Sequence, residues 1–183
     1  MSGSPAELAR AVIHFWCDEL TEEQHFKMDS TVYRHIAERF GKIREEVLRS
    51  MAAGWRDSPE TLVAAIILLD QFSRNMFRGS AKAFEADSLA LELCKEALAK
   101  GWVDRLPKPL PTFFLMPLQH SEKMEDQERS VAEFQGRDPL NYKYALLHRD
   151  QIKRFGRFPG RNQALGRVST AEEREMIERG ETF

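Results

Sequence analysis

Cysteine is scarce in this sequence, and neither a long apolar run nor an excess of one charge is present. Cys17 and Cys94 form no CxxC pair, which excludes a framework of several disulfides and favours a reducing, cytoplasmic location. The longest apolar run, residues 62–69, is too short to span a bilayer. No basic segment followed by an apolar one stands at the N-terminus, so we expect no signal peptide.

The charge balance argues against partners that are bound through overall charge. The net charge is −2 over 183 residues, which is not the basic excess typical of proteins that bind nucleic acids or membrane surfaces. One stretch departs from this balance: residues 149–167 hold six Lys or Arg and one acid. That stretch either meets phosphates or carboxylates of a ligand, or pairs with acids elsewhere in the fold.

Several motifs of cofactor and nucleophile chemistry are also missing. The sequence has no Gly-rich nucleotide loop, no GxSxG and no HExxH, and its His, Asp and Glu residues lack zinc or di-iron spacing. We therefore expect neither a cofactor nor a metal. Hydrophobic residues make up 42% of the chain and charged residues 31%, which predicts a globular protein with one domain over residues 1–183.

What is present is helical periodicity along nearly the whole chain. Apolar residues recur at steps of three and four from Tyr33 to Met51, after a capping Asp29 and before Gly54. Ser58 followed by proline predicts the start of another helix, which runs to about Phe77. Proline is dense in residues 106–111, which predicts an extended linker. Further helices are expected over residues 5–17, 80–101, 112–134 with a kink at Pro117, 140–155, and after a capping box of Ser169 and Glu172.

These helices, without any strand alternation, predict an all-α fold of about seven to eight helices with short connections. Their lengths suit antiparallel helix pairs, arranged either as a right-handed array or as an irregular bundle. No 34-residue repeat is visible in the sequence, so the periodicity alone leaves both arrangements open.

The first polar cluster lies near the end of the helix that starts at Ser58. Asp70 and Arg74 are four residues apart in an apolar stripe and can form an ion pair. Such a pair either locks two helices together or holds Arg74 to bind an anion. Gln71, Asn75 and Arg78 extend the polar surface around the helix end, and we expect them to be more solvated than Asp70.

The second cluster surrounds His120. Helical geometry places His120 and Gln127 on the inward face and Glu122 on the solvent side. An inward histidine is either a satisfied core residue or a general base with a proton within reach.

The third cluster lies on the helix expected over residues 140–155 and in the loop after it. His148 lies in the centre of its apolar stripe, with Asp150 and Arg154 on a flank. The loop after it contains two glycines and a proline, and carries Arg157, Arg161 and Asn162. A preset loop of this kind presents arginines and backbone N–H groups to an anion, or acts as a rigid connector whose phenylalanines fill the core.

With these motifs in view, the chain resembles the bacterial family named domain of unknown function 924. The family pattern favours a proline where Ser73 stands and a histidine where Gly160 stands. The resemblance implies a tetratricopeptide-like fold and no established activity. The matching residues are Phe15-Trp16, the segment 68–79, Ala83-Phe84, Pro117, His120-Ser121-Glu122, Asp126-Gln127, His148-Arg149-Asp150, the segment 154–159, Arg161-Asn162, Leu165-Gly166-Arg167 and Ser169-Thr170.

Three functional hypotheses remain. The first is a site for a small carboxylate or phosphate, with His120 and His148 as acid–base groups, built where the three clusters meet. The second is a scaffold that binds a peptide or protein in a groove between helices. The third is a closed structural network. The ligand-binding candidates of the first are Asp70, Arg74, Asn75, Arg78, Glu122, Asp150, Arg154, Arg157, Arg161 and Asn162.

Overall fold

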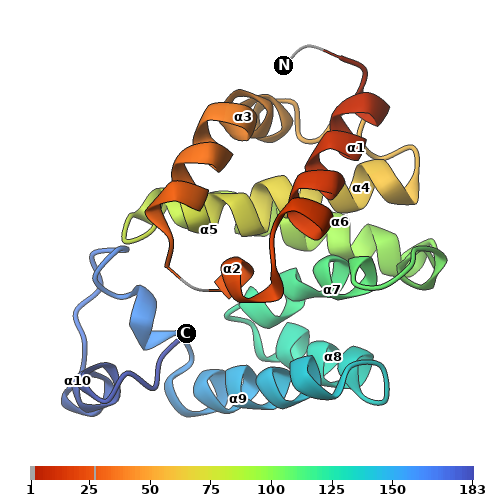
Figure 1. The fold of residues 1–183 in the computed structure, drawn as a ribbon. Helices are drawn as coiled ribbons and strands as arrows, with labels where there is room; N and C mark the ends of the chain where they lie inside the picture. The colour runs from red at the N-terminus through yellow and green to blue at the C-terminus, as the bar shows by residue number, and fades with distance from the viewer. Residues whose placement is uncertain (1–2, 27) are drawn as a thin grey trace. The chain divides into compact units, whose positions relative to one another are not determined.

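A computed structural model describes residues 3–26 and 28–183, and within these residues every regular element is a helix. The all-α prediction is therefore confirmed (Figure 1). Two π-helical turns are present: η1 (Phe15–Glu19) follows the first helix and ends it, and η2 (Ile67–Phe72) lies inside a longer helical stretch. The α-helices are α1 (Pro5–His14), α2 (Glu22–Phe26), α3 (Ser30–Arg49), α4 (Pro59–Ile66), α5 (Ser73–Met76), α6 (Asp87–Ala99), α7 (Leu110–His120), α8 (Met124–Phe134), α9 (Pro139–Phe155) and α10 (Ala171–Glu178), and the 3-10 turns are η3 (Ala81–Ala83), η4 (Val103–Arg105) and η5 (Pro159–Arg161).

The chain divides into two compact units. Unit 1 comprises residues 1–78 and 82–114, and unit 2 comprises residues 79–81 and 115–183. In the part of the chain that the structure describes, no helix is long and apolar enough to cross a membrane.

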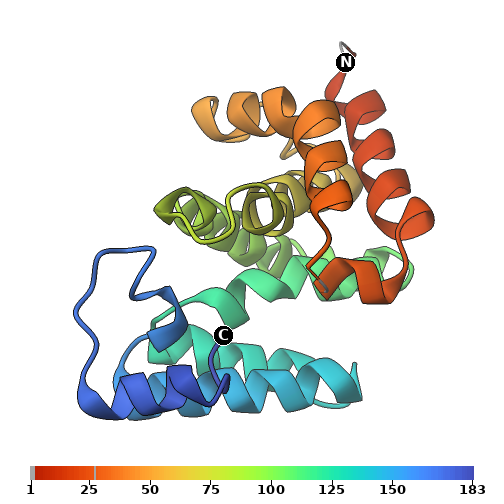
Figure 2. The ribbon, with the colours of Figure 1, turned by 60° about the vertical axis from the view of Figure 1, so that its left-hand side comes forward.

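The core of unit 1 is the continuous helical stretch α4–η2–α5. All residues from 61 to 73 are buried, because α1, α3 and α6 pack around this stretch (Figure 2). Phe15, Phe40 and Phe72 form an aromatic cluster with ring centroids 5.1 to 6.0 Å apart. A helix enclosed in this way has no solvated face, so its polar residues must find partners inside the protein.

The predicted starts of α3 and α4 are confirmed, but the end of α3 is earlier than expected. Asp29 caps α3, and Ser58 caps α4 in a capping box with Thr61. Helix α3 ends at Arg49, because Met51 and Ala52 adopt left-handed backbone conformations before Gly54 is reached. Met51 therefore leaves the apolar stripe and is 54% exposed.

Two other predicted boundaries are wrong. The helix expected over residues 80–101 begins as the single turn η3, and α6 starts only at Asp87. The helix expected over residues 112–134 is two helices, α7 and α8, which separate after His120 while Pro117 stays inside α7. Gln127 explains the break, because its side-chain amide donates to the carbonyls of Gln119 (2.7 Å) and Ser121 (2.6 Å), which are free at the end of α7.

In unit 2, α8 and α9 form an antiparallel pair that runs side by side in both ribbon views (Figures 1 and 2). Asp138 caps α9, and Gly156, with φ of +69°, ends it in the left-handed conformation that glycine tolerates best. Helix α10 packs against η5. Its capping box uses Thr170 and Glu173, one residue later than the Ser169–Glu172 box that we predicted.

Candidate functional site

Asp70 is the acid of the first cluster, and it is fully buried. Its side chain has no exposed surface, and it lies in the π-helical turn η2. Arg74 Nη1 is 3.0 Å from Asp70 Oδ1, and Gln71 Nε2 donates to Asp70 Oδ2 at 2.6 Å. Turns of π-helix are rare and concentrate at functional sites, and this one places a buried carboxylate beside a guanidinium.

A second acid, Asp87 at the start of α6, binds the other side of the Arg74 guanidinium. Arg74 Nη1 and Nη2 donate to the two Asp87 carboxylate oxygens at 2.8 and 2.9 Å. Burial lowers the pKa of Arg74, but the charges of Asp70 and Asp87 raise it by more, so the side chain stays charged. Two carboxylates thus balance this arginine, which leaves it little capacity to bind an anionic ligand.

The rest of the first cluster follows the same inward pattern, with one exception. Gln71 and Asn75 are 6% and 4% exposed, which is more than Asp70 but still buried, because α1, α3 and α6 pack around this stretch. Asn75 Nδ2 donates to the Gln71 carbonyl at 2.9 Å, while Asn75 Oδ1 has no hydrogen-bond partner among the described residues. Arg78 is exposed as expected, and its guanidinium lies 5.3 Å from the Tyr33 ring.

Sequence reasoning missed Arg44, which is fully buried beside this cluster. Arg44 Nε donates to Ser73 Oγ at 3.0 Å, and Nη1 lies 2.6 Å from Glu85 Oε1. One sequence signal was available: Arg44 stands four residues after Phe40, on the same apolar stripe of α3.

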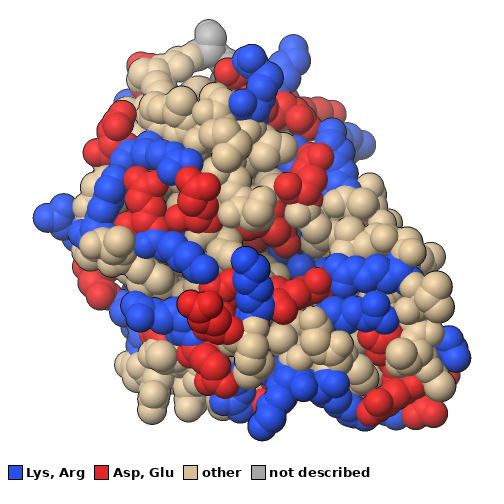
Figure 3. Space-filling model, turned by 180° about the vertical axis from the view of Figure 1, so that it is seen from behind, with Lys and Arg blue, Asp and Glu red and all other residues tan. Residues whose placement is uncertain are grey.

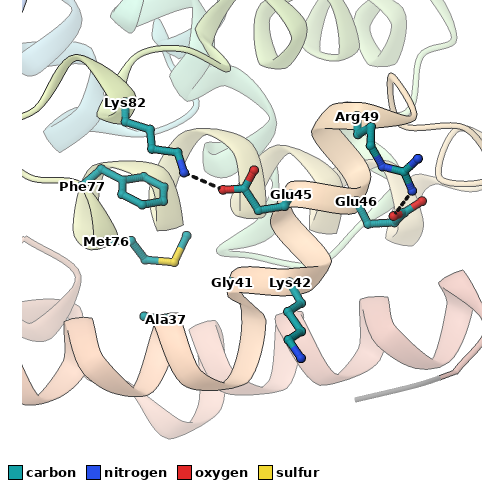
Figure 4. Close-up of a pocket in the computed structure, with 9 residues that line it drawn as sticks. All are labelled: Ala37, Gly41, Lys42, Glu45, Glu46, Arg49, Met76, Phe77 and Lys82. Carbon is teal, nitrogen blue, oxygen red and sulfur yellow. Dashed lines mark hydrogen bonds and ion pairs between the residues drawn. The ribbon is translucent and has the colours of Figure 1, made fainter.

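Two hollows in the surface of the described residues are lined by charged side chains and by neither His120 nor His148. In unit 1 a hollow of about 550 Å³ runs along α3, where Lys82 reaches across the Phe77 ring to bind Glu45 at 2.9 Å (Figure 4). A second hollow of about 550 Å³ in unit 2 is lined by Glu122, Met124, Glu128, Arg149, Ile152, Lys153 and Gly156. Oppositely charged side chains share each hollow, so neither has the one-sided charge that an anion site needs.

The two candidate acid–base residues do meet in unit 2. The His120 ring, at the end of α7, and the His148 ring, on α9, have centroids 6.2 Å apart. His148 Nδ1 lies 2.8 Å from the Tyr144 carbonyl, which can only accept a hydrogen bond. The neutral His148 ring therefore carries its proton on Nδ1 and its lone pair on Nε2.

Turn η5 brings Arg161 to the same place. Arg161 is 8% exposed, its Nη2 donates to the His120 carbonyl at 2.8 Å, and its guanidinium lies 4.5 Å from the Phe158 ring. Phe158 in turn meets the His148 ring edge to face at 5.5 Å. Of the candidate residues, His120, His148 and Arg161 thus form one cluster within unit 2.

The segment 180–183 lies on this cluster. The Phe183 ring stacks on His148 with a centroid distance of 3.8 Å and an interplanar angle of 21°. Gln151 Nε2, one turn along α9, donates to the Glu181 carbonyl at 2.8 Å. Gly160 allows the backbone of residue 183 to come close to η5, because a Cβ at position 160 would lie only 2.6 Å from the Phe183 carbonyl oxygen. Sequence reasoning missed both Gln151 and Phe183.

Glu122 holds the base of the loop after α9. It accepts two hydrogen bonds from Arg167, both of 2.9 Å, and one of 2.8 Å from the Phe158 backbone N–H. Burial raises the pKa of Glu122, but these donors lower it by more. The prediction that Glu122 faces solvent is wrong: with the helix broken after His120, its side chain is only 26% exposed.

Most remaining candidates of unit 2 are bound to acids or exposed. Arg157 and Asn162 both donate to Glu173 on α10, and Arg154 pairs with Glu172 at the surface. Asp150 is exposed and pairs with Arg149. Figure 3 shows the same interleaving of basic and acidic side chains over the visible surface.

The candidates thus fall into groups. Asp70, Arg74, Asn75 and Arg78 belong to unit 1, while the two histidines and the loop arginines belong to unit 2. The meeting of all three clusters at one place stays a prediction. Within the described ranges, no three His, Cys, Asp or Glu side chains are placed to hold a metal ion.

Comparison with known proteins identifies relatives of the whole chain. Residues 12–181 match the model of the family described as "Bacterial protein of unknown function (DUF924)". A solved structure, titled "Structure of Protein of Unknown Function ATU0120 from Agrobacterium tumefaciens", is similar at 35% sequence identity and a TM-score of 0.91. That similarity covers 96% of this chain and 99% of the other. No curated protein matches.

Proposed function

This chain belongs to the DUF924 family of bacterial proteins of unknown function, and within that family we propose that it is a binding protein for extended peptides that carry an aromatic side chain. The binding surface is formed by α9 and η5 of unit 2. The observation that carries this proposal is the segment 180–183, whose Phe183 ring and Glu181 carbonyl already contact this surface.

The surface has three features of peptide recognition. His148 supplies a ring for stacking, Gln151 binds a main-chain carbonyl, and Gly160 leaves room for the peptide backbone. Contacts to main-chain carbonyls give affinity without regard to sequence, whereas the stacking position selects an aromatic residue. The arginines favour this reading over an anion site, because Arg74, Arg154 and Arg157 are each paired with a carboxylate.

The proposal is tested with the acetylated and amidated peptide Gly-Glu-Thr-Phe, labelled for fluorescence anisotropy. The full-length Phe183→Ala protein is the starting variant, since its own ring no longer stacks on His148. Adding His148→Ala is expected to weaken binding about 10-fold, and adding Gln151→Ala about 5-fold, the effects of one lost stack and one lost hydrogen bond.

Leu147→Ala is the matched control, because Leu147 is also on α9, is 43% exposed and belongs to none of the contacts described above. It should leave the affinity unchanged, and a peptide with alanine in place of phenylalanine should not bind. Equal binding by the His148→Ala and Leu147→Ala proteins would contradict the proposal.

A small anionic molecule is the second candidate for the same surface. The nearly buried Arg161 beside His120 and His148 supports it, because a guanidinium binds carboxylate or phosphate. Phosphate and benzoate are the probes, titrated into the Phe183→Ala protein. Binding of either with no binding of the peptide would favour this candidate. A tetratricopeptide-like groove and a cytoplasmic location also stay predictions.

A further inference from the structure

We infer that the segment 180–183 is an internal competitor, which occupies the α9–η5 surface and keeps other peptides from it. The inference rests on the proposed function and adds its regulation. In the structure, the ring and main-chain positions that an incoming peptide needs are already taken by Phe183 and Glu181. Binding of a partner peptide therefore requires the segment to leave first.

The base of the segment is fixed close to its site. Helix α10 is tied to the loop after α9 by Glu173, which accepts hydrogen bonds from Arg157 at 2.7 and 2.8 Å. The Gly180 N–H donates to the Ile177 carbonyl at 3.0 Å, and Gly180, with φ of +67°, turns the chain away from α10. A short segment anchored beside its site has a high effective concentration there, so even weak contacts keep the site mostly occupied.

The contacts of the segment itself are few enough to be reversible. Phe183 remains 38% exposed, and its ring contacts are the stack on His148 and an edge-to-face contact with Tyr144 at 6.4 Å. The Glu181 carbonyl accepts one hydrogen bond from Gln151. The other hydrogen bonds of Glu181, to the Met176 carbonyl at 3.2 Å and to Arg179 at 3.1 Å, stay at the end of α10 and do not hold the segment on the α9–η5 surface. The segment is therefore held far less firmly than α10, and it can leave while α10 stays docked.

The test compares the affinity of the same labelled peptide for full-length wild-type and Phe183→Ala proteins. Loss of the Phe183 ring is expected to raise the affinity about 3- to 10-fold, because the fraction of molecules with an open site increases. Leu147→Ala is expected to match wild type. Thermal unfolding of each variant, followed by circular dichroism, verifies that α10 and the rest of the fold are retained.

Gly160→Ala separates competition from a general loosening of the structure. The added Cβ would lie 2.6 Å from the Phe183 carbonyl oxygen and 3.0 Å from Thr182 Oγ1, so it displaces the segment and leaves its sequence intact. We expect faster amide hydrogen exchange at residues 181–183, but no gain in peptide affinity, because the Cβ blocks an incoming backbone along the same path.

Each other outcome is decisive. Equal affinity of wild-type and Phe183→Ala proteins would overturn the competitor and leave the proposed function standing. No binding to the Phe183→Ala protein would overturn the proposed function itself. A gain in affinity for Gly160→Ala equal to that for Phe183→Ala would support competition for the His148 ring and would contradict only the shared backbone path at Gly160.

Discussion

Replacing Asp70 by asparagine is expected to lower the free energy of unfolding by about 3 kcal/mol, the largest effect among the candidate residues. The substitution removes one of the two carboxylates that balance the buried Arg74. It also removes the charge that Gln71 donates to. An arginine left with incomplete compensation in a low-dielectric core carries a desolvation cost that a surface arginine does not.

Urea unfolding, followed by circular dichroism, measures this loss. Asp150→Asn is the matched control, because Asp150 is an exposed acid paired with the surface residue Arg149, and its change should stay below about 0.5 kcal/mol. If the Asp70→Asn protein were more stable than wild type, the carboxylate would be a strained functional group, and the structural reading of this cluster would be wrong.

Replacing Glu173 by glutamine is expected to cost about 2 kcal/mol at neutral pH and to undock α10. Glu173 is 2% exposed and accepts hydrogen bonds from Arg157, Asn162 and the Thr170 backbone N–H. The Arg157 hydrogen bonds outweigh burial and lower the pKa of Glu173 from 4.5 to about 2. The carboxylate therefore stays charged in the folded protein under conditions where an unfolded chain would protonate it.

The sign of the pH dependence follows from this lowered pKa. Glu173 contributes its full stability above pH 4.5, and the contribution is lost as the pH falls from there towards 2. The stability difference between wild type and Glu173→Gln should thus be large at pH 6 and should shrink below pH 4.5. Glu172→Gln is the control, because Glu172 is 56% exposed and its substitution should change the stability little. A stability difference for Glu173→Gln that does not change with pH would contradict the role of the Glu173 charge.

Local signals predicted the helices well. Ser58 and Asp29 mark helix starts through their own chemistry, so no tertiary information was needed. The extended linker predicted over residues 106–111 is wrong in its second half, because α7 already begins at Leu110 and a proline is tolerated in the first turn of a helix. The burial of Gln71 and Asn75 was missed for a physical reason. Helical periodicity assumes one solvated face, whereas every residue from 61 to 73 is buried.

The candidate site was predicted in part. The apolar stripe of α9 placed His148 correctly, and His120 does lie beside it. The partners of the charged residues depend on long-range packing: Arg74 meets Asp87, Arg157 meets Glu173, and nothing local in the sequence identifies either acid. The same holds for Phe183, which reaches His148 only because α10 folds back against η5.

The most direct test of where this protein binds a partner is an amide NMR titration of the Phe183→Ala protein with the unlabelled peptide Gly-Glu-Thr-Phe. We expect the largest shift changes at His148, Gln151 and Gly160, and none at Asp70 or Asn75. Shift changes centred on the Asp70–Arg74 cluster, or none anywhere, would contradict a binding surface on α9 and η5.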